Sequence, residues 1–119
     1  MSKGWIGVDL DGTLAHYEKW TAHDHIGEPI EAMVNRVRDW IFDGWEVRIF
    51  TARACEPRCI EPIKAWCRQH IGMELAITNQ KDLQMVQLWD DRCVQVVPNT
   101  GMPLTEWIQI APLPTKETE

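Results

Sequence analysis

The sequence lacks any long hydrophobic run, and it contains little cysteine. No stretch approaches the roughly 18 consecutive apolar residues of a membrane-spanning helix, so we expect no membrane span. Four cysteines in 119 residues are too few for a disulfide-stabilised scaffold. No signal-peptide pattern precedes the first predicted strand. These absences favour a cytoplasmic protein whose cysteines are free thiols.

Positive charge is also in the minority. Lys and Arg number 12 against 18 Asp and Glu, which gives a formal net charge of −6. A protein that coats nucleic acid would be basic, so this general function is excluded. An anionic substrate remains compatible with the composition, provided that positive charge is concentrated locally at its site.

What the sequence does contain is enough apolar material for one domain. Its 119 residues are 45% hydrophobic. A chain of this length can bury a stable core without disulfide bonds or a structural metal ion. We expect a catalytic domain over residues 1–112 and a polar tail over residues 113–119. Seven tryptophans are many for this length, and five of them fall in apolar stretches and are expected in the core: Trp5, Trp40, Trp45, Trp66 and Trp89.

The order of the apolar segments predicts an α/β fold with a mostly parallel five-stranded sheet. Right-handed crossovers would bring the carboxyl ends of its strands to one edge. Residues 98–101 read as a turn, and Trp107 and Ile110 are expected to pack back on the core. The predicted strands are residues 5–8, 46–50, 75–78, 86–89 and 93–97, and the predicted helices are residues 31–43 and 62–70.

Acidic residues follow the first predicted strand directly. Asp9 and Asp11 come after the apolar residues 5–8, and Gly12 and Thr13 come next. Carboxylates at the carboxyl end of such a strand sit where open α/β sheets bind ligands. Two acids at this spacing can hold a divalent cation and can attack or protonate a group beside it. The alternative is an acidic turn without chemistry.

Polar residues of suitable types follow two other predicted strands. Thr51 closes the second strand, and Asp90 and Asp91 close the fourth. Lys81 lies on the loop before the fourth strand. Each has a simpler explanation, since Thr51 could be a turn or cap hydroxyl and Lys81 a surface lysine. Their common position at strand ends nevertheless predicts that they converge.

In this order, the segments resemble the four motifs of the haloacid dehalogenase-like phosphohydrolases. The sequence DLDGT at residues 9–13 resembles the first motif, DxDG(T/V), and the apolar strand closed by Thr51 resembles the second. Lys81 and the Asp90–Asp91 pair resemble the third and fourth. The match spans residues 5–92. It implies a Rossmann-like three-layer domain and a phosphatase that forms an aspartyl-phosphate.

The resemblance also implies a role for each matching residue. Asp9 would attack phosphorus, and Asp11 would protonate the leaving oxygen and then activate water. Thr51 and Lys81 would contact the phosphoryl group, and Lys81 would neutralise its charge. Oxygen ligands suit Mg²⁺ better than zinc. The implied Mg²⁺ ligands are Asp9, Asp11 through its main-chain carbonyl, Asp90 and Asp91.

The segments between the motifs leave no room for a cap domain over the site. Residues 15–29 form a polar flap too short to bury its own core, and residues 54–80 are used by one helix and one strand. An open site would admit nucleotides or nucleic-acid ends, on which aromatic flap residues could stack a base. Arg53 and Arg92 are equally compatible with structural ion pairs. The candidate substrate contacts are Leu10, Tyr17, Trp20, Ala52 and Arg53.

Several alternatives stay open from sequence. The protein could be a phosphotransferase, or a non-catalytic phosphate- or protein-binding module on the same fold. Metal binding by the flap histidines, or zinc binding by a cysteine set, is a further alternative. The cysteine spacing is uncommon for zinc, and its helical periodicity favours buried thiols. The oligomeric state is not predicted. The cysteine set consists of Cys55, Cys59, Cys67 and His70.

Overall fold

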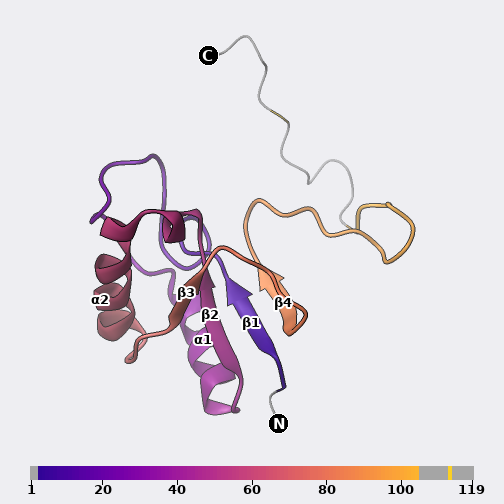
Figure 1. The fold of residues 1–119 in the computed structure, drawn as a ribbon, viewed down its shortest axis with the longest axis horizontal. Coiled ribbons are helices and arrows are strands. Elements are labelled where there is room, and N and C mark those ends of the chain that lie inside the picture. The colour runs from indigo at the N-terminus through magenta and orange to yellow at the C-terminus, as the bar shows by residue number, and fades with distance from the viewer. Residues whose placement is uncertain (1–2, 105–112, 114–119) are drawn as a thin grey trace.

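A four-stranded, all-parallel sheet forms the centre of the molecule (Figure 1). The computed structural model describes residues 3–104 and residue 113. The strand order across the sheet is β3-β2-β1-β4, so β1 is central and β4 lies at one edge. The strands are β1 (Trp5–Val8), β2 (Glu46–Phe50), β3 (Ala76–Thr78) and β4 (Met85–Trp89).

Two helices connect the first three strands. They are α1 (Glu31–Phe42) and α2 (Ile60–His70), and the short 3₁₀ turns η1 (Ala52–Cys55) and η2 (Pro57–Cys59) precede α2. Of the apolar positions of α1 at helical spacing, Met33, Val34 and Val37 are buried, as the sequence pattern predicts. Three tryptophans expected in the core are only partly buried against it: Trp40, Trp45 and Trp89. After α1, Gly44 has a φ of +93° and donates its N–H to the carbonyl of Ile41. A left-handed residue at this position ends a helix.

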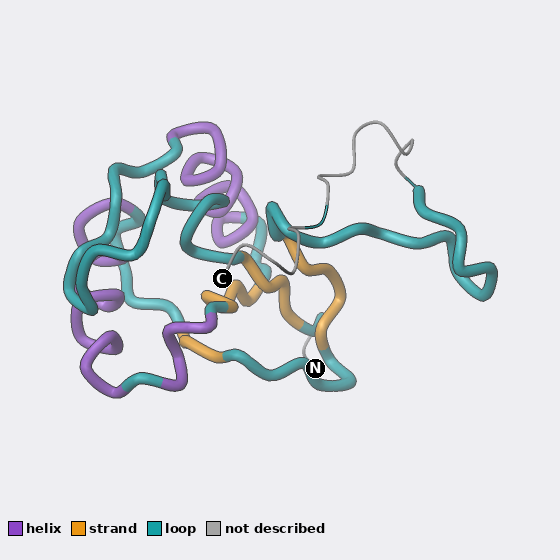
Figure 2. The backbone as a smooth tube through the Cα atoms, turned by 90° about the horizontal axis from the view of Figure 1, so that it is seen from above, coloured by secondary structure: helices purple, strands orange, loops and turns teal. Residues whose placement is uncertain are grey.

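Both helices pack on the same face of the sheet. The chain steps in one direction from β1 to β2 to β3, and right-handed crossovers in one direction place their helices on one side. Figure 2 shows the helices on that side. Val47 and Ile49 of β2 point toward them and join a buried cluster with Val37 and Ile63.

The opposite face of the sheet carries no helix within the described residues. The described residues therefore form two layers instead of the expected three. Trp5 lies on this second face and is still fully buried. The guanidinium of Arg48 lies 4.4 Å from the centre of its ring, and its indole N–H donates to Asp82 at 2.8 Å. The loop between β3 and β4 thus protects part of this face.

The predicted fifth strand at residues 93–97 is wrong. Val96 forms only an isolated antiparallel bridge, to Pro103, and the chain turns away from β4 after residue 92 (Figure 1). The predicted turn is present, with positive φ values of 67° at Asn99 and 75° at Gly101. The predictions for Trp107, Ile110 and the tail beyond residue 113 lie outside the described residues.

In the described part of the chain, no helix has the length and apolar character that a membrane crossing requires.

Candidate active site

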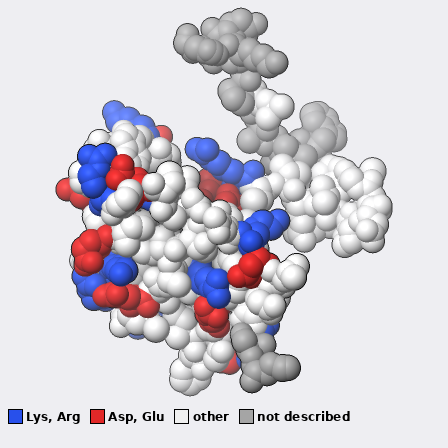
Figure 3. Space-filling view, viewed as in Figure 1, with Lys and Arg blue, Asp and Glu red and all other residues white. Residues whose placement is uncertain are grey.

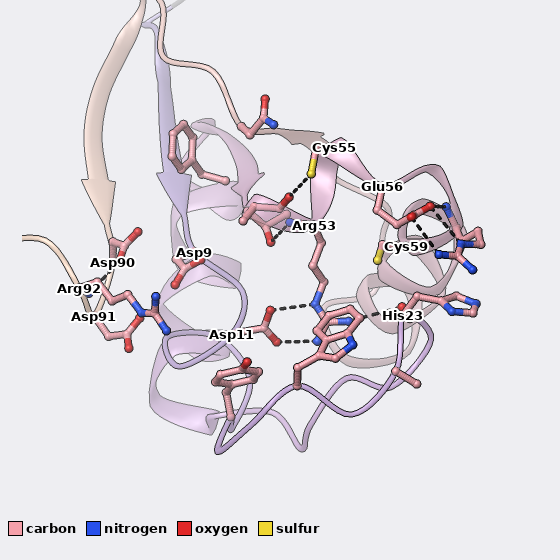
Figure 4. Close-up of a pocket in the computed structure, with 18 of the residues that line it drawn as sticks. Asp9, Asp11, His23, Arg53, Cys55, Glu56, Cys59, Asp90, Asp91 and Arg92 are labelled. Atoms are coloured by element: carbon pink, nitrogen blue, oxygen red, sulfur yellow. Dashed lines mark hydrogen bonds and ion pairs between the residues drawn. The ribbon is translucent and has the colours of Figure 1, made fainter. Parts of the chain in front are cut away.

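Carboxylates from two neighbouring strand ends meet at the carboxyl edge of the sheet (Figure 4). Asp9 follows β1, and Asp90 and Asp91 follow β4, which pairs with β1 in parallel. One oxygen from each of the three side chains lies within 4.8 Å of the other two. We call these three residues the acidic trio. An all-oxygen set at such separations suits a hard cation such as Mg²⁺.

The environment of Asp9 favours its protonated form when no cation is bound. Burial is the main cause, and it raises the pKa of Asp9 to about 7 together with the charge of Asp90 and the hydrogen bond and charge of Asp91. The N–H of Leu10 donates to the Asp9 carboxylate and opposes the rise. A bound cation would reverse the balance, because it favours the ionised form. The acidic trio therefore fits a divalent metal ion by its chemistry as well as its spacing.

The loop after β1 holds the loop after β4 in place. The hydroxyl of Thr13 lies 3.2 Å from Asp91 Oδ1, to which it can donate, and it accepts the N–H of Asp91 at 3.0 Å. Gly12 has a φ of +91°, and a Cβ atom there would come within 2.5 Å of Asp91 Oδ2. Glycine is therefore needed at this position for its conformation and for its lack of a side chain.

Asp11 points toward Arg53 rather than joining the acidic trio (Figure 4). Nε and Nη2 of Arg53 each donate to a different carboxylate oxygen of Asp11 at 2.8 Å. The arginine is buried, and its guanidinium lies 4.8 Å from the ring centre of Trp20 on the flap. Arg53 thus forms an ion pair, one of the two alternatives left open by the sequence. Its partner is a proposed catalytic acid.

Thr51 serves as the cap of the turn that follows β2. Its hydroxyl oxygen accepts the N–H of Arg53 at 3.1 Å, and its side chain is buried. This is the simpler explanation considered from the sequence. The hydroxyl hydrogen remains able to donate to a ligand, because accepting a bond does not use it. Thr51 lines the pocket beside the acids.

A pocket of about 1010 Å³ joins the acidic trio to the flap. Asp11, Thr51 and Ala52 line it, as predicted. Tyr17 and Trp20 also line it, so the flap contributes aromatic surface at the position expected from the sequence. Three arginines also line the pocket, and two of them are paired within it. Arg53 pairs with Asp11 and Arg58 with Glu56, whereas Arg92 has no ion pair among the described residues. The charge of Arg92 is therefore available to an anionic ligand.

Two of the predicted site residues do not line this pocket. The side chain of Leu10 is fully buried in the core, so only its backbone contributes at the site. Lys81 is exposed on the loop after β3. Burial and the charges of Asp90 and Asp9 raise the pKa of Cys93, and the charge of Lys81 partly offsets this rise. Its proposed role at a phosphoryl group stays a prediction.

Sequence reasoning missed two other residues that line the pocket, Asn79 and Arg58, and considered His23 only as one of the flap histidines that could bind a metal. Asn79 follows β3 as Thr51 follows β2, so the strand-end argument could have found it. No comparable signal marks Arg58. Among the described residues, the acidic trio is the one group of metal-ligating side chains close enough to share an ion. The alternative zinc set Cys55, Cys59, Cys67 and His70 does not assemble as such a group, and all four cysteines are free.

Comparisons with known proteins give one informative likeness. A scan against protein-family models finds no match, and a search of curated proteins finds none either. Among solved structures, a conserved protein coded by a locus of Bacteroides thetaiotaomicron is similar, with a TM-score of 0.59 and 24% sequence identity. The likeness covers 81% of this chain and 82% of that one. The chain therefore shares its parallel α/β fold with a conserved bacterial protein.

Proposed function

We propose that the protein is a Mg²⁺-dependent phosphohydrolase of the haloacid dehalogenase-like type. The observation that carries the proposal is the position of Asp9. It ends the central strand, lies with Asp90 and Asp91 in the acidic trio, and is followed two residues later by a second acid. A carboxylate held beside a metal site can act as a nucleophile toward phosphorus.

In the proposed reaction, a carboxylate oxygen of Asp9 forms a bond to phosphorus while the bond to the leaving oxygen breaks. Asp11 donates a proton to that leaving oxygen. It then takes a proton from the water that hydrolyses the aspartyl-phosphate and restores Asp9. Bound Mg²⁺ would neutralise negative charge on the acidic trio and on the phosphoryl oxygens.

The ion pair between Asp11 and Arg53 adds a step to this cycle. A bidentate guanidinium partner stabilises the carboxylate form of Asp11. That form suits the base needed for hydrolysis but not the acid needed for the first step. We infer that Asp11 leaves Arg53 when substrate binds, takes up a proton from solvent and donates it to the leaving oxygen. After hydrolysis, Asp11 releases to solvent the proton that it took from water and returns to Arg53.

The size and lining of the pocket support larger phosphorylated compounds as substrates. The pocket is about 1010 Å³, and its flap wall carries Tyr17 and Trp20. Trp20 is half exposed even though one part of its ring contacts Arg53. A nucleobase stacked on this ring would gain about 1–3 kcal/mol. We therefore propose nucleotides or nucleic-acid ends as the substrate class.

The test is hydrolysis of a phosphorylated oligonucleotide, a mononucleotide and a sugar phosphate with and without Mg²⁺. We expect metal-dependent turnover, with kcat/KM highest for the first two and reduced by Trp20→Ala. Preference for the sugar phosphate, unchanged by Trp20→Ala, would contradict the substrate class. Phosphate binding without any turnover would favour the non-catalytic alternative.

A further inference from the structure

Residues 93–104 form an arm that begins with Cys93 at the rim of the pocket and then stands away from the body of the protein in both views (Figures 1 and 2). The arm is internally ordered. The N–H of Val97 donates to the carbonyl of Met102 at 2.8 Å, and the N–H of Leu104 donates to the carbonyl of Gln95 at 2.7 Å. Among the described residues, the hydrogen bonds of the arm join it only to itself. Its shape is therefore set without support from the body.

The arm is uncharged and largely apolar. Residues 93–104 contain no Asp, Glu, Lys or Arg, although 25% of the chain is charged. Figure 3 shows this region without the red and blue that mark the rest of the surface. Val96 is 50% exposed and Met102 is 62% exposed. A contiguous apolar surface of this kind is typical of a binding surface.

A surface of matching character lies at the edge of the sheet. Within the described chain, β4 pairs with β1 alone, so its outer edge offers backbone groups to a further strand. Residues 83–89 contain no charged side chain, and Val86 is 50% exposed. Edge strands are commonly protected by lysines or other charges, and this one is not.

Pairing of the arm with its own β4 edge as a tight hairpin would disturb the candidate active site. The turn of such a hairpin would be residues 90–92. Those residues already make other hydrogen bonds: the N–H of Asp91 donates to the hydroxyl of Thr13, and the N–H of Arg92 donates to the side chain of Asp90 at 2.7 Å. An arm from a second copy would pair with this edge and leave those contacts in place.

We propose that two copies of the chain exchange arms. The arm of each copy pairs along the outer edge of β4 in the other, as an added strand. Because each copy offers one arm and one edge, a twofold arrangement satisfies both and closes as a dimer. The net charge of −6 on each copy does not oppose this contact directly, because both contacting segments are uncharged.

Sedimentation of the full-length protein over a range of concentrations tests the proposal. We expect a dimer for the wild type and at least tenfold weaker association for Val96→Lys on the arm and for Val86→Lys on the edge. The control is Phe42→Lys, since Phe42 is 90% exposed at the end of α1 and lies outside both surfaces. It should leave the dimer intact. Circular dichroism establishes that each variant is folded.

Mixing the two variants makes the test specific for exchange. A Val86→Lys copy keeps a normal arm, and a Val96→Lys copy keeps a normal edge, so a mixed pair regains one of its two contacts. We expect association in the mixture that neither variant shows alone. A wild type that stays monomeric at about 100 µM would overturn the proposal. So would equal dissociation by Phe42→Lys, which would indicate non-specific association, or a mixture that does not associate.

Discussion

Asp9 and Asp11 lie two residues apart, but the structure gives them different partners. Asp9 belongs to the acidic trio, whereas Asp11 is held by Arg53. Two carboxylates with different surroundings can divide the work of nucleophile and acid–base catalyst between them. Two substitutions test this division.

Asp9→Asn keeps the shape of the side chain and removes its negative charge. Because the amide is not a nucleophile, we expect phosphatase turnover to disappear while the fold persists. Turnover is measured with Mg²⁺ and the preferred substrate, and the fold by circular dichroism. Activity within tenfold of the wild type would show that Asp9 does not attack phosphorus.

Arg53→Ala removes the partner of Asp11 and one neighbour of Trp20. Leaving a half-buried carboxylate without its partner should lower the free energy of unfolding by about 1–3 kcal/mol. Urea denaturation measures this difference. Arg92→Ala is the matched control, because Arg92 lines the same pocket but is exposed, and we expect a change within about 0.5 kcal/mol. Equal effects of the two substitutions would argue against a special role for the Asp11 ion pair.

At the scale of the elements, the two loops at the carboxyl edge depend on each other through Gly12. Gly12→Ala places a Cβ atom 2.5 Å from Asp91 Oδ2 and strains a backbone with a φ of +91°. We expect Asp91 to move, with Mg²⁺ affinity at least tenfold weaker by calorimetry.

The control for Gly12→Ala is Gly72→Ala. Gly72 has a φ of +101°, and a Cβ atom there meets nothing within 4 Å. It therefore carries the conformational cost of the substitution, about 1 kcal/mol, without the clash and away from the acids. Loss of Mg²⁺ affinity in both variants would mean that general destabilisation, not contact with Asp91, is responsible.

The elements also show which features the sequence could predict. β1, β2 and the acids that follow β1 and β4 were predictable, because apolar runs followed abruptly by polar residues mark buried parallel strands. The false strand at residues 93–97 has a different pattern typical of strands, an alternation in which Val94 and Val96 are apolar and Gln95 is polar. Such a pattern indicates that one side of a segment is apolar. It does not indicate whether that side is covered by the same chain or by another molecule. The Asp11–Arg53 pair was not predictable either, since 42 positions separate its members and no local pattern links them.

At the scale of the whole molecule, the raised pKa of Asp9 links stability to pH. The pKa rises from 3.8 to about 7 on folding, so between these values the folded state holds a proton that the unfolded state has lost. This contribution to stability is full below about 4 and is lost as the pH rises through 7. We expect the melting temperature of metal-free protein to fall across this window relative to that of Asp9→Asn.

Mg²⁺ should restore much of the stability that the metal-free protein loses as the pH rises, because the cation replaces the proton as the partner of the acidic trio. A ligand bound only by the folded state stabilises by about 2.7 kcal/mol at a hundredfold excess over its Kd. Melting curves at pH 5 and pH 8, with and without millimolar Mg²⁺, provide the measurement. The Mg²⁺ effect should be larger at pH 8 and nearly absent in Asp9→Asn. A wild type indifferent to Mg²⁺ at both pH values would contradict the metal site.

The pairing of β1 with β4 has a consequence for how the protein acquires its site. Thr13 and Asp91 are 78 positions apart, so their contact closes a loop that spans most of the chain. During synthesis, Asp9 is present long before Asp90 and Asp91, the other two members of the acidic trio. Contacts between such distant segments form late in folding, because their loop-closure entropy must be overcome first. A cation bound by the acidic trio therefore slows unfolding more than it speeds folding. Chains too short to include β4 lack the complete site and would not bind the cation in this way.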